Sequence, residues 1–204
     1  DISKKALVIM CADNGIVEEN VSQSGQDVTA IVAANMASRK SSVCLMAGYT
    51  GAQVIPVDIG IACETIPSGK KIDDMDGILH KKISHGTKNF LKEHAMTDKQ
   101  CIKAIETGKE IVKMCSEKGI NIIATGEMGI GNTTTSAALA AILLDEKPEN
   151  VTGYGAGLTN EGLKNKTETV RKACEMYSGY KDDALKLLSC IGGLDIAGLA
   201  GVFI

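Results

Sequence analysis

Residues 126–135 read GEMGIGNTTT and occupy the most informative position in the chain. Residues 120–124 before them are apolar and rich in β-branched side chains, and residues 136–144 after them have the composition of a buried helix. This order predicts a strand, a glycine-rich turn and a helix. Such a turn exposes backbone N–H groups at the positive end of a helix, where an anion can bind. Because Glu127 lies beside that site, the pattern indicates chemistry on a phosphorylated small molecule.

The composition excludes several classes of protein. The 204 residues are 44% hydrophobic, and 22 Lys and Arg against 25 Asp and Glu leave a net charge of −3. No long basic block and no Trp are present, so we expect neither nucleic acid nor a membrane as a partner. Seven scattered cysteines without a CxxC pair indicate reduced thiols in a cytoplasmic protein, and no His and Cys spacing fits a metal site.

Apolar periodicity predicts alternating strands and helices. The expected strands cover residues 5–11, 53–59 and 120–124, although Pro56 counts against a central position for the second or limits which side pairs. We expect a first helix after a candidate N-cap at Ser24. Further helices are expected at residues 43–47, 97–118, 133–144, 159–177, 184–190 and 194–204. This alternation predicts one α/β domain over residues 1–204, with a mostly parallel sheet and helices on both faces.

Three acids follow predicted strands, where ligands of open α/β sheets collect. They are Asp13, Asp58 and Glu127. Glu127 is the strongest candidate for acid–base catalysis, since a fixed and partly desolvated carboxylate can act as a base near neutral pH. The alternative for each acid is a structural role at a helix start or in a loop. Asn132, Thr133 and Thr134 could likewise cap the following helix, donate hydrogen bonds to phosphate, or do both.

A second glycine-rich loop, at residues 152–158, has GxGxG spacing. It fits the dinucleotide fingerprint poorly, because no clear strand precedes it, and no GxxxxGK[ST] motif occurs in the chain. An NAD(P)-dependent oxidoreductase using this loop therefore remains an alternative of lower rank. Lys166, on the helix after the loop, could meet a phosphate or could simply be solvated.

Several segments occur in the order found in one known family. They are MCADNG at 10–15, VS at 21–22, VT at 28–29, ANM at 34–36, VDIG at 57–60, GEMGIGNTT at 126–134 and GGLD at 192–195. Together they resemble the nicotinate-nucleotide–dimethylbenzimidazole phosphoribosyltransferase family over nearly the whole chain. The resemblance implies a Rossmann-like sheet, a homodimer, no cofactor, and transfer of phosphoribose from nicotinate mononucleotide to a benzimidazole-type base, giving alpha-ribazole phosphate for the cobalamin lower ligand.

The resemblance also implies roles for particular residues. Glu127 lies at the reaction centre, and Ser22, Asp13 and Val32 belong to the base-binding side. The residues implied for the phosphoribosyl group are Gly129, Gly131, Asn132, Thr133, Gly153, Gly155, Gly157 and Lys166.

Two departures from the family pattern limit this transfer. Asn14 stands where the family often has His, and the family's main catalytic glutamate lies in a C-terminal motif beyond residue 204. We therefore expect the core of a longer enzyme, with most of the family's small helical domain missing and weak or no activity alone. A non-catalytic phosphoribosyl-binding sensor is a further alternative.

Overall fold

The computed structural model describes residues 2–65 and 77–204, and its centre is a parallel β-sheet. The sheet has the order β3-β2-β1-β4, and every described pair of neighbouring strands is parallel. The strands are β1 (Lys5–Ala12), β2 (Ala52–Gly60), β3 (Leu79–His80) and β4 (Ile122–Met128). This arrangement confirms the predicted α/β fold with a Rossmann-like parallel sheet.

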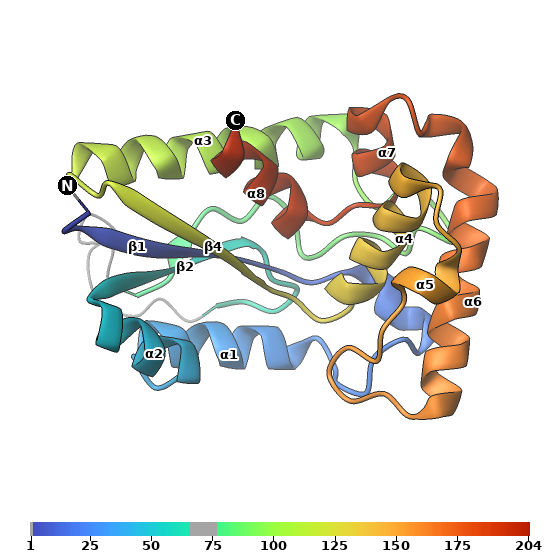
Figure 1. Cartoon of the computed structure of the whole chain (residues 1–204), viewed down its shortest axis with the longest axis horizontal. Helices are drawn as coiled ribbons and strands as arrows, with labels where there is room; N and C mark the ends of the chain where they lie inside the picture. Colours follow the sequence, from blue (N-terminus) through green and yellow to red (C-terminus); the bar gives the residue numbers. More distant parts are fainter. Residues whose placement is uncertain (1, 66–76) are drawn as a thin grey trace.

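Helices cover both faces of this sheet (Figure 1). The helices are α1 (Asp27–Ala37), α2 (Ser42–Thr50), α3 (Asp98–Glu117), α4 (Asn132–Leu144), α5 (Pro148–Val151), α6 (Asn160–Tyr177), α7 (Ala184–Ile191) and α8 (Leu194–Phe203), with short 3₁₀ turns η1 (Gly15–Glu19) and η3 (Ser178–Tyr180). Helices α3 and α8 pack on one face, and α1 and α2 pack on the other. Parallel strands need this covering, because both of their faces are apolar.

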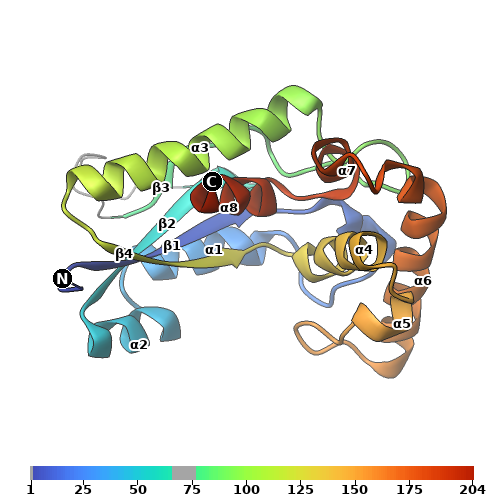
Figure 2. The ribbon, with the colours of Figure 1, turned by 45° about the horizontal axis from the view of Figure 1, so that its top comes forward.

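The alternation of side chains along β1 explains the two layers. Val8 and Met10 point into a core shared with α3 and α8, whereas Ile9 and Cys11 point into a core shared with α1 and α2. A third apolar cluster joins α4, α6 and α7. It lies beyond the carboxyl ends of the strands (Figures 1 and 2). The helices of this cluster therefore wall the edge of the sheet at which ligands are expected.

Local signals set both ends of α3 but not the start of α1. Helix α3 begins after Thr97, whose side chain and that of Gln100 form the predicted capping box, and Gly119 follows it at φ +73°. The predicted cap at Ser24 is wrong: α1 begins at Asp27, because the chain first makes a turn in which Val28 N–H donates to Gly25 O.

Pro56 lies in β2, an inner strand of the described sheet. The proline therefore does not exclude an inner position and affects pairing on one side only. It pairs with Ile9 of β1, whereas β3 begins only opposite Val57, the next residue. The missing N–H of a proline is tolerated at a strand position whose other side lacks a partner. The second reading of Pro56, a limit on which side pairs, is therefore the one that the structure supports.

Candidate functional site

The turn between β4 and α4 begins later than the sequence indicated. The prediction ended the strand at residue 124, but Gly126 pairs with Ile9 and Glu127 with Met10, so both belong to β4. The N–H and C=O groups of a glycine can still pair with a neighbouring strand, so the extent of pairing with β1 sets the end of β4. The turn itself therefore consists of residues 129–131. It follows β4 at the junction with β1, where the strand order reverses and ligands of such sheets bind.

Helix α4 starts at Asn132, with Gly131 as its N-cap at φ +94°. Glycine adopts this left-handed conformation without a Cβ penalty. The reading of Asn132, Thr133 or Thr134 as a cap is therefore wrong, because all three lie inside the first turn of the helix. None of these side chains caps the helix, and the Thr133 hydroxyl is available for a contact across the site. The amides of the same turn carry the positive end of the helix dipole.

Lys166 is the most unusual side chain of this region. It is 1% exposed, and its Nζ donates to Thr133 Oγ1 at 2.7 Å and to Gly153 O at 3.1 Å. No carboxylate in residues 2–65 and 77–204 forms an ion pair with it. The loss of water on burial lowers the pKa of its ammonium group. A buried cation that lacks an anionic partner favours binding of an anion from solution.

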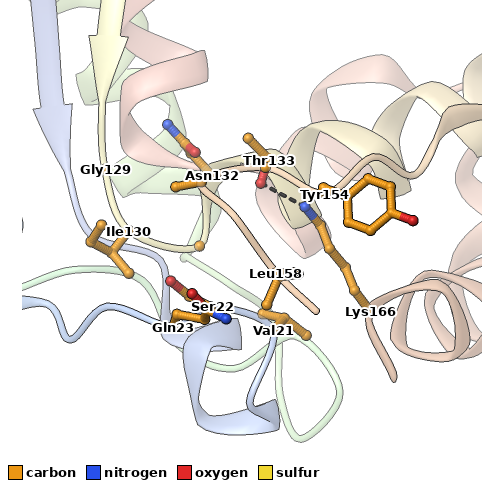
Figure 3. A pocket seen from close by; sticks show the side chains of 13 residues that line it. Val21, Ser22, Gln23, Gly129, Ile130, Asn132, Thr133, Tyr154, Leu158 and Lys166 are labelled. Atoms are coloured by element: carbon orange, nitrogen blue, oxygen red, sulfur yellow. Dashed lines mark hydrogen bonds between the residues drawn. The ribbon is translucent and has the colours of Figure 1, made fainter. Parts of the chain in front are cut away.

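These groups line a pocket of about 50 Å³. Figure 3 shows Ser22 and Gln23 on one side of it, and Thr133 and Lys166, joined by a hydrogen bond, on the other. The predicted residues that line it are Ser22, Gly129, Gly131, Asn132, Thr133, Gly155 and Lys166. Its volume suits the phosphate group of a larger ligand that extends outward. The Asn132 side chain points away from Lys166, so its backbone is the part nearest the pocket (Figure 3).

The loop between α5 and α6 closes the pocket from the side of Lys166. Gly155 adopts φ +57°, and a Cβ there would lie 3.0 Å from Thr133 Oγ1 and 3.2 Å from Lys166 Nζ. Gly153 contributes its carbonyl to Lys166, whereas Gly157, at φ +92°, does not line the pocket. The loop follows a helix rather than a strand. This placement differs from the dinucleotide fingerprint, in which the glycines follow a strand.

Asp13 lies behind the turn rather than in the pocket. It is fully buried, its Oδ1 accepts from Thr29 Oγ1 at 2.5 Å, and its Oδ2 accepts from Ala62 N–H at 2.8 Å. Thr29 Oγ1 in turn accepts from Ile130 N–H at 3.1 Å. Burial raises the pKa of Asp13, although these hydrogen bonds act in the opposite direction. Asp13 therefore holds the turn in place through Thr29.

The other predicted residues lie further from the pocket. Val32 packs in the apolar cluster between α1 and the sheet and does not line the pocket. Asp58 is fully buried, accepts from Ile61 N–H at 3.0 Å and from Thr65 Oγ1 at 2.8 Å, and lies 3.3 Å from Lys82 Nζ. The structural alternative fits Asp58 better than a role in catalysis. The base-binding roles of Asp13 and Val32 stay predictions.

Glu127 lies on β4 next to the turn, but outside the pocket lining. Its side chain is exposed, yet nearby protein atoms remove enough water from the carboxyl group to raise its pKa. A carboxylate of this kind can accept a proton near neutral pH. Its catalytic role stays a prediction, as does every other role assigned by resemblance.

Sequence reasoning missed Tyr154 and Gln23 in the pocket wall and the burial of Asp195. Asp195 had a visible signal, because it is an acid inside the otherwise apolar segment 190–204. Within residues 2–65 and 77–204, no group of three or more His, Cys, Asp or Glu side chains is placed to hold a metal ion. No helix in those residues is long and apolar enough to cross a membrane.

Comparison with known proteins agrees with this geometry. A family model described as Phosphoribosyltransferase matches residues 1–204. Curated proteins named nicotinate-nucleotide–dimethylbenzimidazole phosphoribosyltransferase are similar to the whole chain: that of Acetivibrio thermocellus is 46% identical over 205 residues, and that of Clostridium acetobutylicum is 42% identical over 203 residues. The chain spans 56% and 55% of their respective lengths.

Solved structures show the same fold. The crystal structure of CobT from Thermus thermophilus has a TM-score of 0.88 at 30% identity, covering 100% of this chain and 59% of that one. A second crystal structure from that organism, of the dimethylbenzimidazole phosphoribosyltransferase, has a TM-score of 0.86 at 30% identity and covers 100% of this chain and 58% of that one. The chain therefore belongs to the phosphoribosyltransferase family whose curated members are named nicotinate-nucleotide–dimethylbenzimidazole phosphoribosyltransferase.

Proposed function

We propose that this chain supplies the phosphoribosyl-binding core of an enzyme that transfers phosphoribose from nicotinate mononucleotide to a benzimidazole-type base. The product is alpha-ribazole phosphate, used for the cobalamin lower ligand. The observation that carries the proposal is the buried Lys166, which has no carboxylate partner in the described structure and bonds to Thr133 at the first turn of α4. The names of the similar curated proteins support this choice of donor and acceptor.

The chemistry suits these residues. The phosphate would occupy the pocket, where the ammonium group of Lys166 and the α4 amides stabilise negative charge. The bond between the anomeric carbon and the pyridinium nitrogen of nicotinate breaks, and the nitrogen keeps the electron pair, so nicotinate needs no proton to leave. A benzimidazole, in contrast, must lose its N–H proton when it bonds to the anomeric carbon. Glu127 is proposed to accept that proton. Holding the base and the sugar in line removes much of the entropic barrier. We also propose a homodimer that works in the cytoplasm.

The alternatives fit less well. An oxidoreductase would use the loop at residues 152–158, but that loop lies between α5 and α6 without a preceding strand. A non-catalytic sensor would bind phosphoribosyl compounds with the same pocket. The two readings differ in what Glu127 does, because only an enzyme needs an acceptor for the proton.

The test uses a chimera, because the chain spans about half the length of its curated relatives. This chain replaces the matching 205 residues of the Acetivibrio thermocellus protein, and formation of alpha-ribazole phosphate from nicotinate mononucleotide and dimethylbenzimidazole is followed by mass spectrometry. We expect turnover in the chimera. We also expect a loss of about 100-fold or more in E127Q with binding of nicotinate mononucleotide retained.

Each alternative has its own outcome in this test. Binding of nicotinate mononucleotide without turnover in the chimera, while the parental enzyme is active, favours the sensor. A thermal shift of this chain with NAD(P) but not with nicotinate mononucleotide favours the oxidoreductase. Either result would refute the proposed transfer.

A further inference from the structure

Asp195 is a buried acid that has no role in the proposed reaction. It lies in the first turn of α8, it is 0% exposed, and neither of its carboxylate oxygens has a hydrogen-bond partner in the described part of the chain. An ionised carboxylate in such a place is costly. A buried polar group without a partner therefore calls for a physical explanation.

Asn14 connects Asp195 to the pocket turn. A Cβ at Gly193 would lie 2.1 Å from Asp195 Oδ1 and 2.7 Å from Asn14 Oδ1, so both side chains crowd against that glycine. Asn14 Oδ1 also accepts from Thr135 Oγ1 of α4 at 3.1 Å, and its backbone oxygen would be 3.0 Å from a Cβ at Gly131. Asn14 therefore lies between Asp195 and the turn that lines the pocket.

Glu127 lies on the same face of the sheet as α8. It is in register with Met10, and partners in neighbouring parallel strands direct their side chains to the same side. Met10 packs in the core with Leu194 and Ala197 of α8, and Figure 2 shows α8 on that face. The two acids therefore approach one another from β4 and α8, next to a turn proposed to hold an anion.

We propose that Asp195 is a positioning residue that sets the charge beside this turn. As a neutral acid it leaves Glu127 as the single negative charge of the pair, and as a carboxylate it adds a second charge that repels a bound anion. The role of Glu127 as a base rests on the proposed function, whereas the coupling between the two acids does not.

The electrostatic environment supports this assignment. Burial first, and then the charge of Glu127, raise the pKa of Asp195 to about 7, while the backbone N–H groups of Ile196 and Asp195 and then the Asn14 amide act in the opposite direction. The Cys11 thiol of β1 points to the opposite face of the sheet, and burial raises its pKa so far that it stays neutral. Asp58 of β2 is balanced by Lys82 at 3.3 Å. The charged α3 side chains that form ion pairs are exposed: Asp98, Lys103, Glu106, Glu110, Lys113 and Glu117.

The coupling is tested on this chain by carboxyl ¹³C NMR. We expect Asp195 to titrate near pH 7 in the wild type and at a lower pH in E127Q, which removes the neighbouring charge. The matched control is E117Q on the exposed face of α3, where we expect no change. An Asp195 that titrates like a solvent-exposed aspartate, or whose titration is the same in E127Q, would overturn the proposal and leave the proposed function standing.

The effect on anion binding is tested with sulfate, which stays a dianion throughout. We expect the sulfate dissociation constant of the wild type to rise at least about twofold more between pH 6 and pH 8 than that of D195N. Deprotonation of Lys166 would contribute equally to both proteins. Equal pH dependence in the two proteins contradicts the proposal. An absence of sulfate binding at either pH refutes the anion site itself, and the NMR titration then still decides whether Asp195 and Glu127 are coupled.

Discussion

The ammonium group of Lys166 donates a hydrogen bond of 2.7 Å to the hydroxyl of Thr133 at the pocket. The two residues are 33 positions apart in sequence and lie on different helices. This bond joins the end of a buried side chain on α6 to the first turn of α4. A positive charge and a helix N-terminus then act on the same small volume. The charge of Lys166 and the N-terminus of α4 would each favour an anion on its own. Because both act at this pocket, the phosphate is the best-supported part of the proposed ligand.

Replacing Lys166 by Met should abolish most anion binding. A charge-assisted hydrogen bond contributes about 1.5–3 kcal/mol, so we expect the sulfate affinity to fall by roughly 10- to 100-fold. Thermal stability should hold or rise, since a desolvated cation is replaced by an apolar chain of similar length. The control is K164M, at an exposed position on the same helix. Calorimetric titration that gave equal affinities for K166M and K164M would contradict this role.

Gly155 should be intolerant of any side chain. In G155A the Cβ would press on Thr133 Oγ1 and Lys166 Nζ, and an alanine at φ +57° costs about 1–2 kcal/mol. We expect a lower unfolding temperature and at least about tenfold weaker sulfate binding. G153A is the matched control in the same loop, because a Cβ there meets nothing within 4 Å. Similar losses in both variants would show general damage to the loop rather than crowding of the pair.

Local patterns predicted the parts of the fold that depend on local interactions. The apolar run at β1 and the Thr97–Gln100 capping box act over a few residues, and the structure has both. The end of β4 depended on its pairing with β1, so Gly126 and Glu127 looked like a turn in sequence but extend the strand. Tertiary pairing overrides local propensity in such cases.

The site shows the same division. The glycine pattern at residues 126–134 indicated an anion-binding turn, and the structure places residues 129–133 of it around a pocket. The sequence could not separate a solvated Lys166 from a buried one, because burial depends on α6 packing against α4 and on the loop at residue 153. Asp13 looked like a ligand group, yet Thr29 and Ala62, far from it in sequence, use both of its oxygens.

Thr29 should be essential for holding the turn. Its hydroxyl donates to Asp13 and accepts from Ile130 N–H, so T29V leaves two buried polar groups unpartnered without changing the side-chain shape much. We expect a loss of about 2–3 kcal/mol in the free energy of unfolding and weaker sulfate binding. T29S keeps the hydroxyl and should lose less than about 1.5 kcal/mol. Chemical denaturation compares the three proteins, and equal stability of T29V and T29S would show that the hydroxyl does not hold the turn.

The contribution of Asp195 to the stability of the chain should fall as the pH rises from about 4 to 7. Asp195 has an ordinary pKa of 3.8 and a folded-state pKa of about 7, so between these values the folded state binds more protons than the unfolded state. The slope of the unfolding free energy with pH is therefore negative in this window. Its contribution is complete below the unfolded pKa and lost as the pH passes the folded pKa. At 1.36 kcal/mol per pH unit, the full change is about 4 kcal/mol.

D195N isolates this contribution, because an amide of the same shape is neutral at every pH. Urea unfolding at pH 4, 5.5, 7 and 8 should show that the unfolding free energy of the wild type falls relative to that of D195N between about pH 4 and pH 7, and that the difference between the two proteins is constant above about pH 7. Asp13, whose pKa is also raised by burial, is present in both proteins and cancels in the difference. Parallel curves for the two proteins would mean that Asp195 is already ionised in the folded state at acidic pH, and that some group outside the carboxyl pair satisfies its charge.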